Sequence, residues 1–159
     1  MKVPVPLGKT KSAAEFSWVI DRGQFLDAEF KTEMTRTLAA FHAETCHTLV
    51  LVTAASLEGQ AIESYSLALA NDLGLGYTRF NNGLMLLVAP NDRRARIEVG
   101  CGLEDVVSDT AAAQIMSQQL VPAFRSGNYA EGIREGMREL MLLTRRKIIP
   151  PAYRPAGCD

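Results

Sequence analysis

Two apolar runs with a helix pattern between them constrain the fold of this chain most. Thr48–Thr53 (TLVLVT) and residues 84–89 (LMLLVA) are nearly continuous apolar segments of strand length. Such segments are typical of strands that are covered on both faces of a sheet. Between them, apolar side chains recur at three- and four-residue spacing and predict a helix: Ile62, Tyr65, Leu69 and Leu73. Two parallel neighbouring strands require such a crossover, so we expect the two runs to pair in parallel.

The first part of the chain predicts one strand and one helix. Residues 18–20 are a short strand candidate, and Asp27 is a plausible N-cap for a following helix. The apolar face of that helix has helical spacing: Phe30, Met34, Leu38 and Phe41. We expect residues 1–15 to be a loose segment, residues 16–147 to form a single domain, and residues 148–159 to be a linker or tail.

The second part predicts a hairpin and then helices only. A polar turn at residues 90–93 reverses the chain into the alternating stretch 94–100, which should pair antiparallel to residues 84–89. A helix capped by Ser108 or Asp109 should run to about Leu120, where Pro122 and Gly127 are expected to break the helix. A last helix, capped by Asn128, has the apolar face Tyr129, Ile133, Met137, Leu140 and Leu143 or Thr144.

The element order is therefore β-α-β-α-β-β-α-α. This order predicts an α/β fold in three layers, an α/β/α sandwich, whose sheet is mostly parallel with one antiparallel strand. We also expect at least one of Gly74, Gly76, Gly83 and Gly102 to adopt positive φ.

Composition narrows the classes of partner. The chain has 159 residues, 47% hydrophobic and 22% charged, and a net charge of −1. That balance is typical of a globular domain and gives no electrostatic basis for binding nucleic acid. Basic residues accumulate late in the sequence: Arg134, Arg138, Arg145, Arg146, Lys147 and Arg154. They are either a solvated helix face, which we favour, or a surface for anionic lipid or an acidic partner.

Cysteines and termini say little about the compartment. Cys46, Cys101 and Cys158 have no CxxC spacing, so we expect free thiols and neither a zinc site nor a disulfide framework. The N-terminus lacks the apolar segment of a signal peptide, and no run reaches the roughly 18 apolar residues of a membrane span. We expect a soluble chain, which could still be an excised domain.

Acidic and amide side chains gather at one end of the predicted hairpin. Asn82 precedes the first strand, and Glu104, Asp105 and Asp109 follow the second. Carboxylate and amide oxygens are the ligands that hard cations prefer, so we predict a divalent-cation site, for calcium rather than magnesium. The alternatives are structural: Asn82 as a turn residue, Asp109 as an N-cap and Glu104 as a charge at a helix start.

Asp21 is harder to place. If its strand runs parallel to Thr48–Thr53, Asp21 lies at the opposite end of the sheet, near Asp92. If that strand is reversed, Asp21 is a fourth ligand beside Glu104. Both alternatives stay open.

The sequence contains no established catalytic motif. Patterns such as GxSxG, HExxH and the phosphate-binding glycine loops are absent. His42 and His47 are expected on the first helix and just after it, away from the glycine loops. Arg93, Arg94 and Arg96 could neutralise a phosphate, but the last two alternate with Ala95 and Ile97 as a solvated strand face would.

Short motifs in this order, from about Val19 to Leu143, resemble the TPM-domain family. The motifs are VID at 19–21, SLEG at 56–59, IESY at 62–65, LGLG at 73–76, NGLMLLVA at 82–89, RIEVG at 96–100, GLE at 102–104, PAFR at 122–125 and GNY at 127–129. The family includes bacterial exported or membrane-anchored proteins, a thylakoid-lumen protein of photosystem II repair and an animal acetylcholine-receptor modulator.

The resemblance implies an α/β/α sandwich and, in several members, a bound divalent cation at acidic loops. It also implies an acid phosphatase activity in the plant branch and accessory or assembly roles elsewhere. The chain departs from the family pattern at Cys101, where an aromatic residue is more usual, and in lacking a signal peptide and a membrane helix. The resemblance favours a periplasmic or membrane-associated location, with a cytoplasmic one as the alternative.

Two functions therefore stand as hypotheses. The first is a non-catalytic, divalent-cation-binding accessory domain that acts through a protein partner, either in solution or at a membrane. The second is a metal-assisted acid phosphatase that hydrolyses a small phosphate ester.

Overall fold

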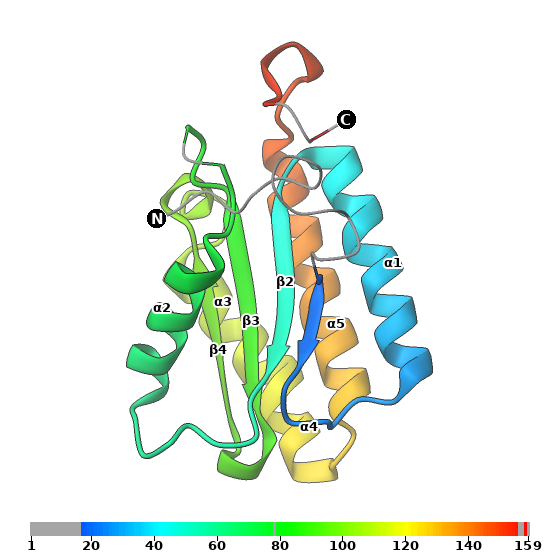
Figure 1. Ribbon diagram of the computed structural model, residues 1–159, viewed down its shortest axis with the longest axis vertical. Coiled ribbons are helices and arrows are strands. Elements are labelled where there is room, and N and C mark those ends of the chain that lie inside the picture. The colour runs from blue at the N-terminus through cyan, green and yellow to red at the C-terminus, as the bar shows by residue number, and fades with distance from the viewer. Residues whose placement is uncertain (1–16, 78, 156–157, 159) are drawn as a thin grey trace.

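The computed structural model describes residues 17–77, 79–155 and 158, so the predicted loose segment 1–15 lies outside the described residues. A four-stranded sheet in the order β1-β2-β3-β4 forms its centre (Figure 1). The strands are β1 (Val19–Asp21), β2 (Thr48–Thr53), β3 (Gly83–Ala89) and β4 (Arg94–Val99). The first three are parallel and β4 is antiparallel to β3, which confirms the predicted sheet.

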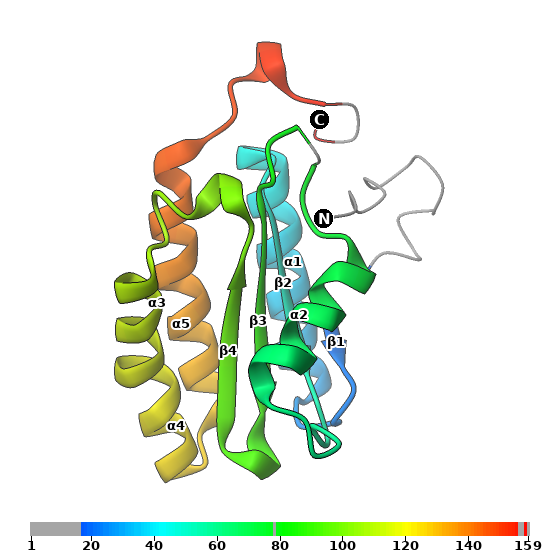
Figure 2. The same ribbon diagram turned by 90° about the vertical axis from the view of Figure 1, so that its left-hand side faces the viewer.

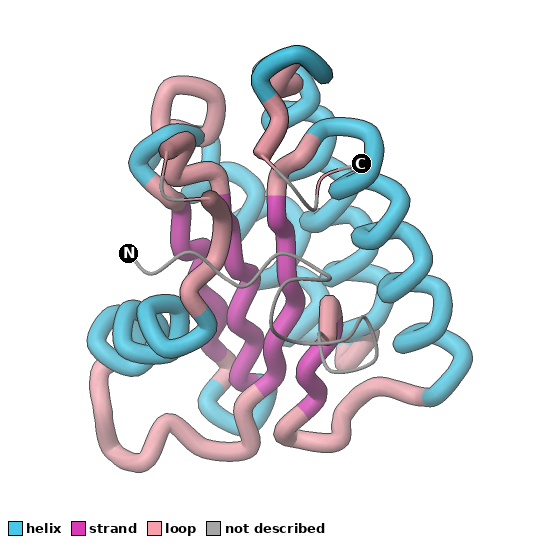
Figure 3. The backbone as a smooth tube through the Cα atoms, turned by 45° about the horizontal axis from the view of Figure 1, so that its top comes forward, coloured by secondary structure: helices cyan, strands magenta, loops and turns pink. Residues whose placement is uncertain are grey.

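Helices cover both faces of the sheet. They are α1 (Ala28–Thr45), α2 (Ile62–Leu73), α3 (Asp109–Ile115), α4 (Val121–Ser126) and α5 (Tyr129–Thr144). Figure 2 shows α2 on one side of the sheet and α3, α4 and α5 on the other, and Figure 3 shows the strands enclosed by helices. Salt bridges join α1 to α5, from Glu33 to Arg134 at 2.8 Å, and to the residue just after α5, from Glu44 to Arg145 at 2.6 Å. The predicted three-layer architecture is confirmed.

The two apolar runs form the centre of the core. Every residue of β2 and β3 is buried, as doubly covered strands should be. Helix α1 adds Phe30, Met34, Leu38 and Phe41, the face predicted from its spacing. Helix α5 adds Ile133, Met137, Leu140 and Thr144, which decides between the two alternatives for its last core position.

Side chains at the predicted caps begin three helices. The Asp27 carboxylate accepts from the Phe30 amide at 2.7 Å, and the Asn128 side chain accepts from the Glu131 amide at 3.4 Å. The Ser108 hydroxyl, rather than Asp109, caps α3 by accepting from the Ala111 amide at 3.1 Å. Each of these bonds satisfies an amide that the first helical turn leaves unpaired.

The prediction that Pro122 breaks the helix after Leu120 is wrong. A π-helical turn (Met116–Leu120) joins α3 to α4, and Pro122 lies in the first turn of α4. A proline costs little there, because the wider hydrogen-bonding register of the π turn does not require its missing N–H. Gly127 does end the helix, with φ of 78°.

Glycines allow two loops to cross closely at one end of the sheet. The loop between α2 and β3 passes over the 3-10 turn Cys101–Leu103, and a Cβ at Gly102 would collide with the Phe80 carbonyl. Gly74 and Gly76 have φ of 60° and 80°, which confirms the prediction of positive φ among the four glycines. At Gly83 and Gly102 the close approach of backbone is what excludes a side chain.

The described part of segment 148–159, predicted as a linker or tail, packs on the end of α1. The Ile149 amide donates to the Thr45 carbonyl at 3.3 Å, and the Arg154 guanidinium donates to the carbonyls of Ile149, Ala43 and Glu44. Cys158 forms a disulfide with Cys46.

This disulfide corrects the prediction of free thiols at both positions. The two cysteines are 112 residues apart in sequence, with Cα atoms 5.1 Å apart. Local spacing patterns such as CxxC cannot detect a bond that forms only when the C-terminal segment folds back. Cys101 is a free thiol, as predicted, and is exposed.

Candidate functional site

The hairpin between β3 and β4 brings the predicted acidic region to one end of the sheet. Leu84 pairs with Val99, and the Gly100 amide donates to the Gly83 carbonyl at 2.8 Å. The Gly102 amide then donates to the Asn81 carbonyl at 3.0 Å. The predicted proximity of residues 81–82 to residues 100–104 is therefore confirmed for the backbone.

A cleft of about 430 Å³ lies between β4 and α3. Its strand side is formed by residues 95–99, and its helix side by Ala112, Ala113 and Met116. Glu104, Ser108 and Asp109 line its end, just before and at the start of α3. Two of the five predicted ligands, Glu104 and Asp109, thus come to the same hollow.

The carboxylates of Glu104 and Asp109 are available to a ligand. Both residues are exposed, and neither forms an ion pair with a basic residue in the described part of the chain. Two carboxylates on one cleft repel each other in water only weakly, but they attract a cation jointly.

Asp105 is engaged elsewhere. Its carboxylate accepts from the Lys147 ammonium at 2.9 Å, beyond the end of α5. That hydrogen bond, with the lysine charge, lowers the pKa of Asp105 below its usual value. Asp105 therefore acts as an exposed tie between the turn before α3 and the end of α5.

Asn82 is buried, with its polar atoms bonded inside the protein. Its side-chain oxygen accepts from the Tyr77 amide at 2.9 Å. Its amide group donates to the Cys46 carbonyl at 2.8 Å and lies 3.2 Å from Nδ1 of His47. The side chain is 2% exposed and does not line the cleft. The structural alternative for Asn82 is a turn residue before Gly83, and these contacts show in addition that its side chain ties the loop before β3 to the end of α1.

The expectation that His42 and His47 lie away from the glycine loops is wrong. Nε2 of His42 is 3.0 Å from the Tyr77 hydroxyl, and His47 contacts Asn82, so both histidines hold the loop that follows Gly76. Burial lowers the pKa of His42 to about 4 and also lowers that of His47, while it raises the pKa of Tyr77 to about 12. Nε2 of His47 is buried and has no hydrogen-bond partner among the described residues.

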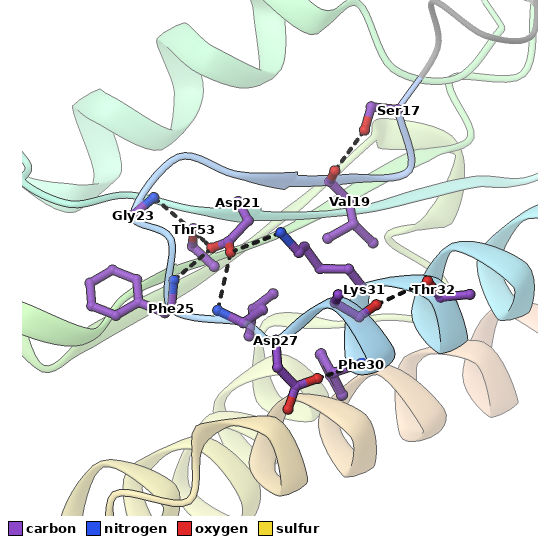
Figure 4. Close-up of polar contacts among 12 residues, drawn as sticks. Ser17, Val19, Asp21, Gly23, Phe25, Asp27, Phe30, Lys31, Thr32 and Thr53 are labelled. Atoms are coloured by element: carbon purple, nitrogen blue, oxygen red, sulfur yellow. Dashed lines mark hydrogen bonds and ion pairs between the residues drawn. The ribbon is translucent and has the colours of Figure 1, made fainter.

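Asp21 lies at the opposite end of the sheet from Glu104, because β1 is parallel to β2. The reversed-strand alternative, in which Asp21 joins Glu104, is therefore excluded. Figure 4 shows its carboxylate enclosed by the turn into α1: one oxygen accepts from the Phe25 amide and the Thr53 hydroxyl, and the other from the Leu26 amide. The Lys31 ammonium lies 3.9 Å away. These contacts fix the β1–α1 turn.

One group of three potential metal-ligating side chains converges in the described part of the chain, and the sequence did not indicate it. The ligand atoms of His42, Cys46 and Cys158 lie within 4.8 Å of one another, and all three residues are buried. In this state the two sulfurs are joined in a disulfide, so they are not thiolates and offer a metal little. The group depends on the C-terminal segment reaching the end of α1, which no motif spacing predicts.

The chemistry of the cleft is acidic and not nucleophilic. Its lining residues include neither histidine nor cysteine. The Ser108 hydroxyl caps α3, and Arg96, the cleft's basic residue, is bonded to Glu98 at 3.2 Å. The arrangement can attract a cation, but its side chains do not form a nucleophile–base pair.

The model of the TPM domain matches residues 19–142, most of the chain. This chain belongs to the TPM-domain family. Its structure is similar to the N-terminal domain of a protein from P. gingivalis, with 32% identity, a TM-score of 0.77, and coverage of 86% of this chain and 87% of that one.

Two further solved structures share the fold. The BA42 protein of the psychrophilic bacterium Bizionia argentinensis is 19% identical, with a TM-score of 0.68 and coverage of 79% and 85% of the two chains. The N-terminal domain of the cg2496 protein of Corynebacterium glutamicum is 16% identical, with a TM-score of 0.60 and coverage of 90% and 87%. No curated protein matches the chain. Within the described residues, none of the helices is long and apolar enough to cross a membrane.

Proposed function

We propose that this TPM domain is a non-catalytic accessory domain that binds a divalent cation at the cleft between β4 and α3 and acts through a protein partner. The observation that carries the cation site is the pair Glu104 and Asp109, two exposed carboxylates on one open hollow. Neither is used in an ion pair with the described residues. A bound cation would satisfy both at once.

The residues present fit a weak, partly hydrated cation. Asn82, Asp105 and Asp21 are each bonded inside the protein, so two carboxylates remain from the predicted set. Magnesium is commonly held by one or two carboxylates and several waters. Calcium takes roughly 6–8 oxygen ligands, from protein and water together. Backbone carbonyls and waters would have to complete either set, so both ions belong in the test.

Thermal unfolding with calcium, with magnesium and with chelator tests the cation site. A cation that binds the folded state raises the unfolding midpoint by mass action. Glu104→Gln and Asp109→Asn should each reduce that rise. Asp105→Asn is the matched control, because Asp105 is an exposed neighbouring acid that pairs with Lys147 and should leave the rise unchanged. A rise that survives both Glu104→Gln and Asp109→Asn would show that the cation binds elsewhere.

A metal-assisted acid phosphatase remains the second candidate. Arg96 is one of the residues around the cleft that the two acids line. Its guanidinium is bonded to Glu98 at 3.2 Å and would have to turn into the cleft to neutralise a phosphate oxygen. The family model that matches residues 19–142 is named for a phosphatase, which favours the same candidate. Turnover of a chromogenic phosphate ester that requires the cation, and falls with both Arg96→Gln and Glu104→Gln, would favour hydrolysis. Absence of such turnover in a protein that binds the cation would favour the accessory role.

The disulfide supports an extracytoplasmic location. Disulfides such as Cys46–Cys158 persist mainly in oxidising compartments, which agrees with the periplasmic or exported location that the family implies. The basic residues near the C-terminus fit the solvated-face alternative and lend no support to a lipid surface. Several of them already bond acceptors of the domain itself: Arg134, Arg138, Arg145, Lys147 and Arg154.

A further inference from the structure

Strand β4 has an open edge. It is the last strand of the sheet, and Figure 2 shows it facing outward between α2 and α3. The Gly100 amide donates to the Gly83 carbonyl, so the hydrogen-bonded pairs with β3 recur at every second residue, at Glu98 and Arg96. The residues between them, Ala95, Ile97 and Val99, direct their N–H and C=O groups away from β3. These groups form a row of main-chain donors and acceptors, and no strand of the described residues lies beside them.

The charged side chains of β4 do not obstruct this edge on the α3 side. Proteins often protect an edge strand with charges. Here the Glu98 carboxylate accepts from the Ser66 hydroxyl of α2 at 2.8 Å and from Arg96 at 3.2 Å, so these two groups are held on the α2 side of the sheet. The exposed Arg94, two residues before Arg96, belongs to the same face of the strand. The α3 side presents small and apolar residues instead: Ala95, Val99, Ala112, Ala113 and Met116.

The cleft beside the edge has the size and charge to receive an extended chain. Its volume of about 430 Å³ lies along residues 95–99, so its length follows the strand. The end of the cleft carries the exposed acids Glu104 and Asp109. A groove between an edge strand and a helix is the arrangement in which peptides bind by adding a strand to a sheet.

We propose that an extended segment of a partner protein binds as a fifth strand along β4, in the groove between β4 and α3. The main-chain groups of Ala95, Ile97 and Val99 bond its backbone. The alanines of α3 leave room for its small apolar side chains, and a lysine or arginine of the segment lies at Glu104 and Asp109. The inference specifies the partner of the proposed function. Because the basic side chain of the segment uses the same two carboxylates as the cation, segment and cation compete there, and the segment binds in the absence of the cation.

This proposal is tested with a library of phage-displayed random peptides of twelve residues. The library is selected on the disulfide-intact protein in the presence of chelator, so that no divalent cation occupies the acids. Selected peptides are synthesised and titrated by fluorescence polarisation. Val99→Pro removes an outward N–H that does not bond β3, and edge strands tolerate a proline at such a position. The variant should bind the peptide about tenfold more weakly. Val99→Ala keeps that N–H and is its matched control.

A second pair of variants tests the helix side without altering the strand. Ala113 is exposed and lines the groove, so Ala113→Tyr should block it. Gln114 is the next residue of α3, exposed and outside the groove lining, so Gln114→Tyr is the matched control. Hydrogen exchange should show the amides of residues 95, 97 and 99 protected on binding.

The outcomes separate this inference from the cation site. Basic peptides that lose affinity with Val99→Pro and Ala113→Tyr, but not with the controls, support the proposal. Any of three results would overturn it. They are a selection that yields no peptide, peptides that bind both variants as well as the wild type, and a β4 edge that binds only a second copy of this protein. Cation-dependent melting that persists in any of those cases would leave the proposed cation site standing.

Discussion

Asn82→Ala should destabilise this domain strongly, whether or not a cation is present. Asn82 is 2% exposed and joins three partners: the Tyr77 amide at 2.9 Å, the Cys46 carbonyl at 2.8 Å and His47 at 3.2 Å. The alanine variant leaves those groups buried and unpaired, and each such group costs about 1–3 kcal/mol. Because water can enter the space and bond some of them, we expect a total loss of about 3 kcal/mol in the free energy of unfolding.

Urea unfolding under non-reducing conditions measures this loss. Asn91→Ala is the matched control, since Asn91 is exposed and makes one side-chain bond, to the Ala55 carbonyl at 3.1 Å. We expect that control to lose about 1 kcal/mol or less. Equal stabilities for the two variants would refute the role of Asn82 as the joint between the loop and the end of α1. A loss of cation binding without a loss of stability would instead identify Asn82 as a ligand.

Three further predictions concern the same framework. Cys158→Ser should lower the free energy of unfolding by about 4 kcal/mol, because the disulfide closes a long loop in the unfolded chain. Urea unfolding with and without reductant measures this loss, and a wild-type protein whose stability does not change with reductant would contradict it. Because the pKa of His42 is about 4 in the folded protein, the unfolded chain takes up a proton between pH 6.5 and 4 that the folded chain does not, so the free energy of unfolding should fall by up to about 3 kcal/mol over that range. Urea unfolding midpoints should therefore depend less steeply on pH in His42→Gln than in the wild type, and equal dependence would contradict this role of His42. Asp21→Asn should lower the free energy of unfolding by about 2 kcal/mol, since one amide oxygen cannot replace the two carboxylate oxygens that accept bonds in the β1–α1 turn. Asp92 is exposed, so Asp92→Asn should change that free energy little, and equal losses in urea unfolding would refute the role of Asp21 in the turn.

Periodicity in the sequence predicted the fold because most of its determinants are local. The bounds of β2 and α2 match the predicted segments, and Asp27, Ser108 and Asn128 cap helices through bonds to amides three residues away. Parallel pairing followed from the crossover helix alone. Pro122 was misjudged because the π turn before it, which makes the proline tolerable, has no simple sequence signal.

The candidate site was less predictable because its contacts are long-range. The hairpin register placed Asn82 beside residues 100–104, yet the direction of its side chain depends on Cys46 and His47, which lie 36 and 35 residues earlier. Asp105 pairs with Lys147, 42 residues later. Glu104 and Asp109 line the same cleft because only a short connection, residues 100–108, leads from β4 to α3, which sequence spacing could indicate. The disulfide, which joins the end of α1 to the C-terminal segment, could not be found in this way.

Mapping of amide chemical shifts during titration with calcium and with magnesium tests the central claim most directly. The proposal predicts saturable shifts at residues 102–110 and at the end of β4, which disappear when Glu104→Gln and Asp109→Asn are combined. Two results would contradict a cation site at Glu104 and Asp109. One is that the shifts gather around Asp21 and Asp92, at the opposite end of the sheet, and the other is that neither ion causes a saturable shift.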